Sequence, residues 1–329
     1  MTPKTRNRLF NLARILISVA LLAWVLSRAG LAQLAAAARA ADLRLYLLAV
    51  GLAAAGIFMR AARWLALLRA VGARVPGRRA VYLYFVGAFF NTFLPTGFGG
   101  DVVRVLEIGE GATSEQAAGT ALVDRLTGFI MLFVLALGAL PWSYALLPGN
   151  LALLIGLLAL AVLGGSALLF EGRLIRRLTA WLPRAISPAG DAWIGKTYAV
   201  ITACGWRGIG AALGWSLAFN LLLILSNVLV ARALGLAVSP WVFFAFVPVT
   251  SAALLVPISI SGLGVREGLY VLLFGQVGVA QPQAVALSLG VYALDVAMGL
   301  IGGALYLGAG VLGLRKTGTQ GTRGEEPRS

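Results

Sequence analysis

LPTGFGGDVVR, the string at residues 94–104, places glycines and charges inside very apolar sequence. A similar string, VPISISGLGVR, occupies residues 256–266, and in both strings an arginine follows a proline by nine positions. Glycine and proline interrupt helices, and bare backbone is tolerated in the hydrocarbon of a membrane only where protein or a water-filled cavity surrounds it. We therefore expect the two strings to meet near the middle of a membrane protein and to form a site there.

Composition places the chain among helical membrane proteins. Of its 329 residues, 60% are hydrophobic and 12% are charged, whereas charged residues make up about a quarter of a soluble domain. Several apolar windows reach the roughly 20 residues that a membrane-spanning helix needs. We expect an all-α integral membrane protein, with one polytopic membrane domain over residues 1–314 and a disordered cytoplasmic tail over 315–329.

The formal net charge of +15 could indicate nucleic acid, but the basic residues stand at the ends of apolar segments. An excess of Lys and Arg in cytoplasmic loops and attraction to anionic lipids explain this placement better, so no nucleic-acid partner is expected. The sequence has no histidine and one cysteine, Cys204. It therefore excludes histidine-based catalytic triads, multi-thiolate metal sites and internal disulfides, and no metal or other cofactor is expected.

Apolar segments predict about six membrane-spanning helices and two shorter hairpins. The six spans are predicted over residues about 9–26, 45–68, 116–140, 151–170, 209–234 and 283–312. The hairpins, about 80–112 and 241–276, contain the two strings, and the limbs of the first are too short to span the membrane comfortably. We interpret both as re-entrant helical hairpins.

The distribution of basic residues supports this topology over one in which residues 80–94 cross the membrane. With a re-entrant first hairpin, the basic segments 69–79 and 171–207 both face the cytoplasm, as do the two chain termini. The exception follows the first span: Arg28, Arg39 and Arg44. The first span is expected to be a retained helix rather than a cleaved signal peptide, because further spans follow it.

The two strings belong to longer similar units, residues about 45–141 and 208–312. Each unit contains, in order, Arg-Ala-x-Gly, a hairpin with its string, Gln-Ala, and an aspartate followed four residues later by glycine. In the predicted topology the first unit starts outside and the second starts inside, so the units form an inverted repeat. The alternative is that apolar, glycine-rich sequence aligns with itself by chance.

Arg104 and Arg266 end the two strings and are the first candidates for a binding site. A guanidinium in the bilayer costs about 2.5 kcal/mol or more, so it needs a partner or a function. Its planar fork of donors suits phosphate oxygens, and the amino ends of helices favour anions. The two arginines are therefore expected to bind phosphate together, unless each one pairs with an acidic residue or caps backbone carbonyls.

Other polar residues of the apolar segments complete the predicted site. Asp124 and Asp295 lie in the spans that close the two units, where they either pair permanently with the arginines or take up a proton as the site changes access. The other candidates for substrate binding are Asp101, Glu267, Arg60, Arg63, Asn91, Gly100 and Gly262. Arg60 and Arg63 either line the cavity or snorkel to the cytoplasmic surface.

Four short motifs of this chain occur together in a known membrane domain. They are NTFLP at 91–95, GGDVVR at 99–104, DRL at 124–126 and PxSxSGLGVREG at 257–268. With them, residues about 9–312 resemble the flippase-like membrane domain of lysylphosphatidylglycerol synthases. In the bifunctional relatives this domain moves aminoacylated phosphatidylglycerol across the membrane, and a separate soluble domain makes that lipid. The resemblance implies lipid translocation without the synthase activity, and it implies a site at Arg104, Asp124, Arg266 and Glu267.

These features predict a transporter with no catalytic residue, a flippase in the cytoplasmic membrane. Its expected partner is a lipid with an anionic phosphate headgroup, either a phospholipid or a polyprenyl-phosphate-linked lipid. One alternative is a membrane-embedded transferase acting on lipids or lipid-linked sugars, for which only intramembrane Asp and Glu could supply an acid, a base or a nucleophile. Another is a membrane subunit that partners a separate lipid-modifying enzyme or glycosyltransferase.

Overall fold

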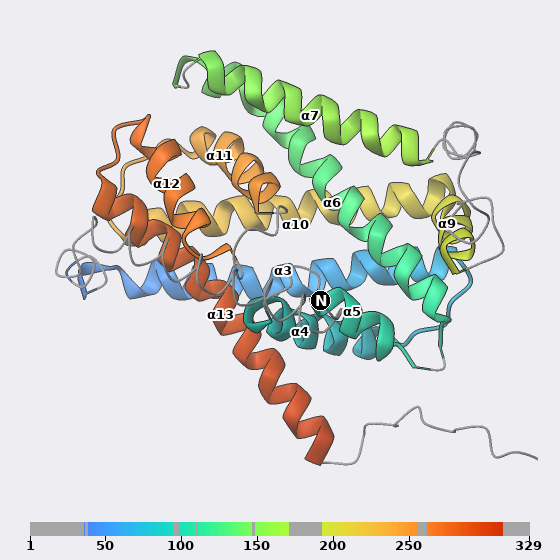
Figure 1. Ribbon diagram of the computed structural model, residues 1–329. Helices are drawn as coiled ribbons and strands as arrows, with labels where there is room; N and C mark the ends of the chain where they lie inside the picture. Colours follow the sequence, from blue (N-terminus) through green and yellow to red (C-terminus); the bar gives the residue numbers. More distant parts are fainter. Residues whose placement is uncertain are drawn as a thin grey trace, which may run out of the picture.

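The computed structural model describes residues 36, 39–94, 99–109, 111–146, 149–170, 193–254 and 262–311 (Figure 1). All regular structure within these ranges is helical. The first predicted span, the tail at 315–329, and Pro95 and Pro257 of the two strings lie outside the described residues.

Five long helices form the body of the protein. They are α3 (Leu43–Ala70), α6 (Ser114–Ser143), α7 (Gly149–Phe170), α10 (Gly205–Ala233) and α13 (Gln281–Val311). Each contains a stretch of at least 21 residues that is apolar enough to cross a membrane, and together they coincide with five of the six predicted spans. Two short elements complete this part, the turn η1 (Tyr144–Leu146) and the helix α9 (Trp193–Ala203). The chain is therefore a multi-pass, all-α membrane protein.

Side-chain caps set the starts of two long helices. The Asp42 carboxylate accepts a hydrogen bond from the backbone N–H of Arg44 at the start of α3 (2.8 Å). At the start of α6, the Thr113 hydroxyl accepts from the backbone N–H of Gln116, and the Gln116 side chain accepts from that of Thr113. These caps satisfy donors that the first helical turn leaves without partners.

α3 and α10 lie side by side and run in opposite directions at the centre of the fold (Figure 1). At one end, which we call the Asp42 end, the backbone N–H of Asp42 donates to the carbonyl of Ala233 (2.8 Å). At the other, which we call the Gln116 end, the Gln116 side chain donates to the carbonyl of Val71 just after α3 (3.0 Å).

Two pairs of shorter helices are inserted at opposite ends of this α3–α10 pair. The first is α4 (Gly77–Phe93) with α5 (Gly99–Leu106), and the second is α11 (Pro240–Ala253) with α12 (Val265–Gly275). The first pair begins and ends at the Gln116 end, where the backbone N–H of Arg74 donates to the carbonyl of Gly111 (2.8 Å). The second pair begins and ends at the Asp42 end, where residues 235–239 and 277–279 line one shared hollow.

Glycines let α13 and α5 approach α4 very closely. A Cβ atom at Gly302 of α13 would lie 1.8 Å from the carbonyl oxygen of Phe85, and one at Gly100 of α5 would lie 2.1 Å from that of Gly87. Small residues at such crossings are typical of membrane helices, whose association depends on tight packing rather than on escape from water. The packing of α4 is therefore specified by backbone contact on both sides.

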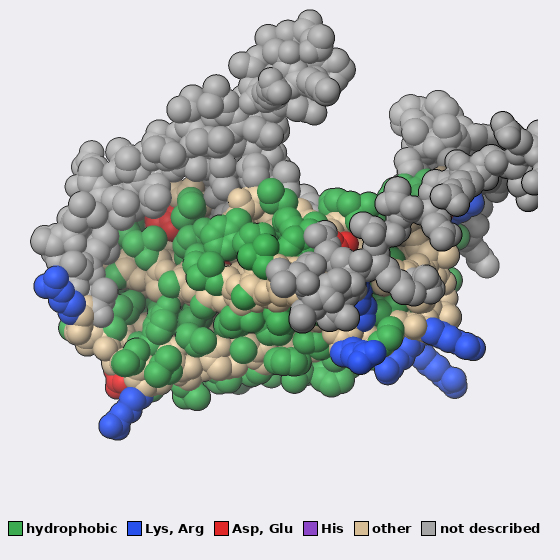
Figure 2. All heavy atoms as spheres, turned by 90° about the horizontal axis from the view of Figure 1, so that it is seen from below, with side chains coloured by type: hydrophobic (Ala, Val, Ile, Leu, Met, Phe, Trp, Pro, Cys, Tyr) green, Lys and Arg blue, Asp and Glu red, His purple; other side chains and the backbone are tan. Residues whose placement is uncertain are grey.

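The face seen in Figure 2 has a largely hydrophobic middle, with Lys and Arg side chains gathered near its two ends. This pattern is expected when the middle of a protein faces lipid and its ends face water and headgroups. It agrees with the direction of α3 and α10, which run from one of these ends to the other (Figure 1).

Candidate functional site

Asp124, on α6, is the centre of a buried ion-pair cluster. Its Oδ1 atom lies 2.5 Å from Nε of Arg63 on α3, and its Oδ2 atom lies 3.5 Å from Nη1 of Arg104 on α5. The hydroxyl of Tyr84 on α4 donates to the same Oδ2 atom. None of these three charged side chains is more than 4% exposed. One buried carboxylate therefore links four helices.

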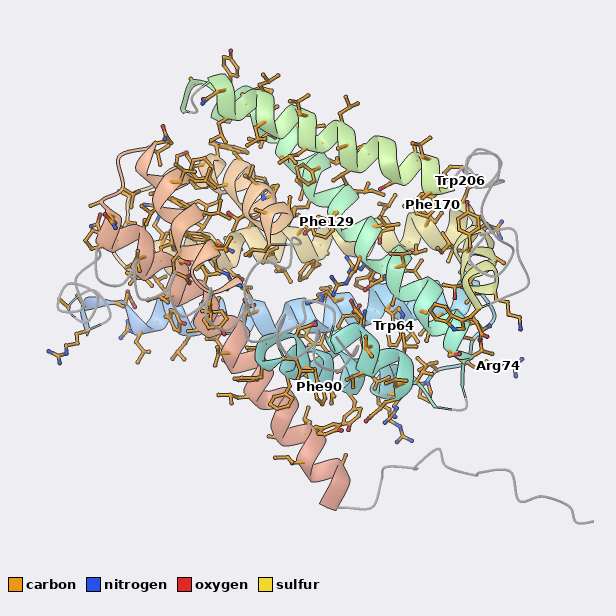
Figure 3. All side chains as sticks on the ribbon, viewed as in Figure 1. Trp64, Arg74, Phe90, Phe129, Phe170 and Trp206 are labelled. Carbon is orange, nitrogen blue, oxygen red and sulfur yellow. The ribbon has the colours of Figure 1, made fainter. Side chains whose placement is uncertain are left out.

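Arg104 is enclosed by this cluster. Its guanidinium lies 4.1 Å from the centre of the Tyr84 ring and 4.8 Å from that of the Trp64 ring. Asp101, one turn earlier on α5, accepts hydrogen bonds from Arg104 and from Arg125 of α6. Trp64 projects from α3 toward α4 (Figure 3) and covers the cluster.

The second half of the chain contains an ion pair of the same type in a more open setting. Nη1 of Arg266, in the first turn of α12, lies 3.0 Å from Oδ2 of Asp295 on α13. In both halves, therefore, the arginine that ends the string pairs with the aspartate of the next long helix. The exposure of the two pairs differs, because the Arg266 and Asp295 side chains are 12% and 56% exposed.

Arg266 and Asp295 line a pocket of about 260 Å³. The pocket lies between residues 52–60 of α3, 219–227 of α10 and 291–298 of α13, which are the central parts of these long helices. The end of α4 and the first turn of α12 complete its wall. A pocket with charged and amide side chains in a largely apolar wall is thus placed about half-way along helices that are long enough to span the membrane.

Arg60 lines the same pocket from α3. Its guanidinium lies 5.2 Å from the centre of the Tyr84 ring and 5.4 Å from that of the Phe219 ring. No carboxylate among the described residues lies within 4 Å of it, whereas Arg63, Arg104, Arg125 and Arg266 each have at least one. Arg60 is therefore a half-buried cation that faces the pocket without an acidic partner in the described part of the chain.

The remaining predicted site residues shape the breaks between helices. Asn91 lines the pocket, and its Oδ1 atom accepts from the backbone N–H of Gly100 across the first break (2.8 Å). Gly262 has a φ of +76°, a conformation that favours glycine. The buried Glu267 accepts from the backbone N–H of Gly264 at the start of α12 (2.5 Å), as a capping residue does.

The structure thus divides the charged and amide residues of the predicted site into two main groups. The pocket contains Arg60, Asn91, Arg266 and Asp295, and the buried cluster contains Arg63, Arg104, Asp101 and Asp124. Arg104 does not line the pocket, so it does not face Arg266 across a shared hollow as the sequence led us to expect. Two carboxylates and two aromatic rings hold it beside the pocket. Arg63 pairs with Asp124 and does not snorkel to the surface.

Sequence reasoning missed the aromatic residues of the site, namely Trp64, Tyr84, Phe219 and Tyr292, the last of which lines the pocket with its ring centre 5.0 Å from the Arg266 guanidinium. In apolar helices such residues look like ordinary packing residues, and no spacing distinguishes those that face a buried arginine. Arg125 was also absent from the predicted site, although its place next to Asp124 in the DRL motif is a signal that could have identified it.

Two guanidinium groups and one exposed carboxylate are the charged groups that the pocket offers to a ligand. Guanidinium groups bind planar or tetrahedral oxyanions through several donors at once, so the arrangement suits phosphate oxygens. Within the described ranges, no group of three or more His, Cys, Asp or Glu side chains is placed to hold a metal ion.

Comparison with known proteins identifies the family. Residues 11–303 match the family described as "Lysylphosphatidylglycerol synthase TM region". No curated protein and no solved structure matches the chain. The matched residues contain both strings, the buried cluster and the pocket. The chain therefore belongs to the family of lysylphosphatidylglycerol synthase transmembrane regions.

Proposed function

We propose that this protein is a flippase that moves a lipid with an anionic phosphate headgroup across the cytoplasmic membrane. The observation that carries the proposal is the pocket half-way along the membrane-spanning helices, which presents the guanidinium groups of Arg60 and Arg266. Arginine within a membrane is costly and marks ligand pathways when it is not a purely structural partner. The family is consistent with a role in membrane-lipid metabolism or transport.

The size of the pocket suits a headgroup rather than a whole lipid. About 260 Å³ is less than the volume of a typical site for a drug-sized ligand. A flippase needs a polar path for the headgroup alone, because the acyl or prenyl chains can remain in the bilayer. As the phosphate binds, Arg266 would leave Asp295 and pair with the phosphate instead.

The proposed cycle uses the two broken helix pairs as re-entrant hairpins of an inverted repeat. They begin and end at opposite ends of the α3–α10 pair, and both reach the pocket, α4 through Asn91 and α12 through Arg266. In transporters with inverted repeats, broken helices meet near the midplane and one repeat rocks against the other. In this proposal the Gln116 end and both chain termini face the cytoplasm, and residues 9–26 form a sixth span.

Cysteine labelling tests this topology, because the native protein is expected to react little with a thiol reagent. Cys204 is the one cysteine of the sequence, and it is buried. Burial raises the pKa of its thiol to about 11, so it stays largely protonated and unreactive at neutral pH.

Exposed positions flank each helix pair: Arg78 and Ser114 for the first, Ala237 and Ala280 for the second. We expect Arg78→Cys and Ser114→Cys to react with a membrane-impermeant maleimide only after the cytoplasmic face is opened. Ala237→Cys and Ala280→Cys should react in intact cells. Labelling of Arg78→Cys and Ser114→Cys from opposite sides would mean that the first pair crosses the membrane, and it would contradict the re-entrant topology.

Reconstituted protein tests the transport itself. In liposomes with fluorescent phosphatidylglycerol, wild-type protein should accelerate movement of the probe between leaflets without altering it chemically. We expect Arg266→Ala to slow this movement by about 10- to 100-fold, the loss associated with a hydrogen bond to a charged group. Arg232→Ala is the matched control, since Arg232 lies at the exposed end of α10, outside the pocket.

The same liposome experiment distinguishes the proposed flippase from the two alternative functions. Mass spectrometry that finds a chemically changed lipid would favour the membrane-embedded transferase. Folded protein that neither moves nor modifies any lipid probe would favour the partner subunit. If Arg266→Ala moved lipid at the wild-type rate, Arg266 would not be part of the binding site.

A further inference from the structure

Building on the proposed function, we infer that Arg60 receives the headgroup's negative charge, and that the pocket selects lipids whose headgroup carries one net negative charge. Arg60 projects into the pocket from the middle of α3, and no carboxylate of the described residues approaches within 4 Å. Its described neighbours are the faces of the Tyr84 and Phe219 rings. These aromatic faces hold the guanidinium in place without forming an ion pair with it.

The charges around the pocket do not balance. The buried cluster and the pocket, together with Arg125 and Glu267, contain five arginines and four acidic residues: Arg60, Arg63, Arg104, Arg125 and Arg266, against Asp101, Asp124, Glu267 and Asp295. Both carboxylate oxygens of Glu267 accept hydrogen bonds, from the Gly264 backbone N–H and the Ser288 hydroxyl. One positive charge is therefore in excess, and the geometry assigns it to Arg60.

The other arginines are less available to a ligand. Arg63 and Arg104 share the buried Asp124, and Arg125 pairs with Asp101. Arg266 can bind an anion only by leaving Asp295, which would uncover a negative charge in the same pocket. Arg60 can bind an anion without separating any ion pair.

Charge balance then defines the class of ligand. Inside a membrane an uncompensated charge is strongly unfavourable, so the most stable complex is the one with the least net charge. A phosphodiester headgroup with one negative charge neutralises Arg60. A headgroup with two negative charges leaves an excess anion, and one with a net positive charge adds to the existing excess.

Binding of short-chain lipids to the purified full chain tests this inference. The probes are dioctanoyl phosphatidylglycerol, with one negative charge, dioctanoyl phosphatidate, a phosphate monoester used at a pH above its second pKa so that it carries two negative charges, and the dioctanoyl form of lysylphosphatidylglycerol, with net positive charge. We expect the first to bind most tightly. Arg60→Gln should weaken its binding by about 10- to 100-fold, the range for a charged hydrogen bond. Arg60→Lys should retain most of it.

Arg44→Gln is the control, because Arg44 is an exposed arginine on the same helix and lies outside the pocket. Undiminished binding of phosphatidylglycerol by Arg60→Gln would overturn the inference and leave the proposed flippase intact. Equal or tighter binding of either other probe by the wild-type protein would overturn it without any variant, even if Arg60→Gln fails to fold. If none of the three lipids binds the wild-type protein, the inference fails, whereas the proposed function fails only if the liposomes also show no movement of any lipid probe.

Discussion

Replacement of Asp124 by asparagine is expected to destabilise the folded protein by about 3–5 kcal/mol, the usual cost of removing one partner from a buried ion pair. The carboxylate is 1% exposed and serves two arginines and a tyrosine hydroxyl from three other helices. Asparagine keeps the shape of the side chain but removes its charge. Arg63 and Arg104 would then remain buried beside each other without enough negative charge to balance them.

The chain contains its own reporter for this measurement. A thiol-reactive fluorogenic dye should label the buried Cys204 only as the protein unfolds in detergent. We expect the midpoint of thermal unfolding of Asp124→Asn to fall by about 10 °C, given about 2–4 °C per kcal/mol for domains of 150–250 residues. Asp295→Asn is the matched control from the second half, and it should lose much less because its carboxylate is 56% exposed and has one arginine partner. Equal losses in the two variants would show that burial does not distinguish the two ion pairs.

Replacement of Gly302 by alanine should have the second largest effect. The added Cβ atom would lie 1.8 Å from the carbonyl oxygen of Phe85 and 2.5 Å from its carbonyl carbon. These are backbone atoms in the middle of α4, so they cannot rotate away as a side chain would. α13 and α4 would have to separate, at a cost near or above the upper end of the ~1–3 kcal/mol typical of overpacking.

Gly308 provides the control on the same helix, because nothing lies within 4 Å of a Cβ atom placed there. Gly308→Ala should leave the unfolding midpoint unchanged or raise it slightly, since alanine favours the helix more than glycine does. Gly302→Ala should lower the unfolding midpoint. The same variant should also move lipid more slowly in liposomes, because the packing of α4 is disturbed. Equal midpoints for the two variants would contradict the close crossing of α13 and α4.

Much of the architecture could be predicted because it depends on local sequence. The length of an apolar stretch specifies a spanning helix wherever it packs, and five predicted spans coincide with α3, α6, α7, α10 and α13. The strings were predicted to interrupt helices, and α4–α5 and α11–α12 are separated at those places. The orientation of the protein in the membrane and the two re-entrant hairpins stay predictions.

The site was predicted less completely, because its parts come together from distant positions. Sequence reasoning named Arg104 and Arg266 as equivalent residues, and each does pair with the aspartate of its own half. It could not foresee that the first pair would be buried and the second exposed. That difference depends on neighbours from other helices: Arg63 and Tyr84 also contact Asp124, whereas Arg266 is the one ion-pair partner of Asp295 among the described residues.

By itself, the sequence determined that this is a helical membrane protein with two glycine-rich breaks, each followed by an arginine. Hydrophobic length and helix-breaking residues act locally, so these features need no knowledge of the packing. Only the tertiary structure decided which arginines pair with a carboxylate and which one faces the pocket without such a partner among the described residues. Whether a buried charge is compensated depends on the few ångströms between side chains from different helices, and those distances follow from how the helices pack.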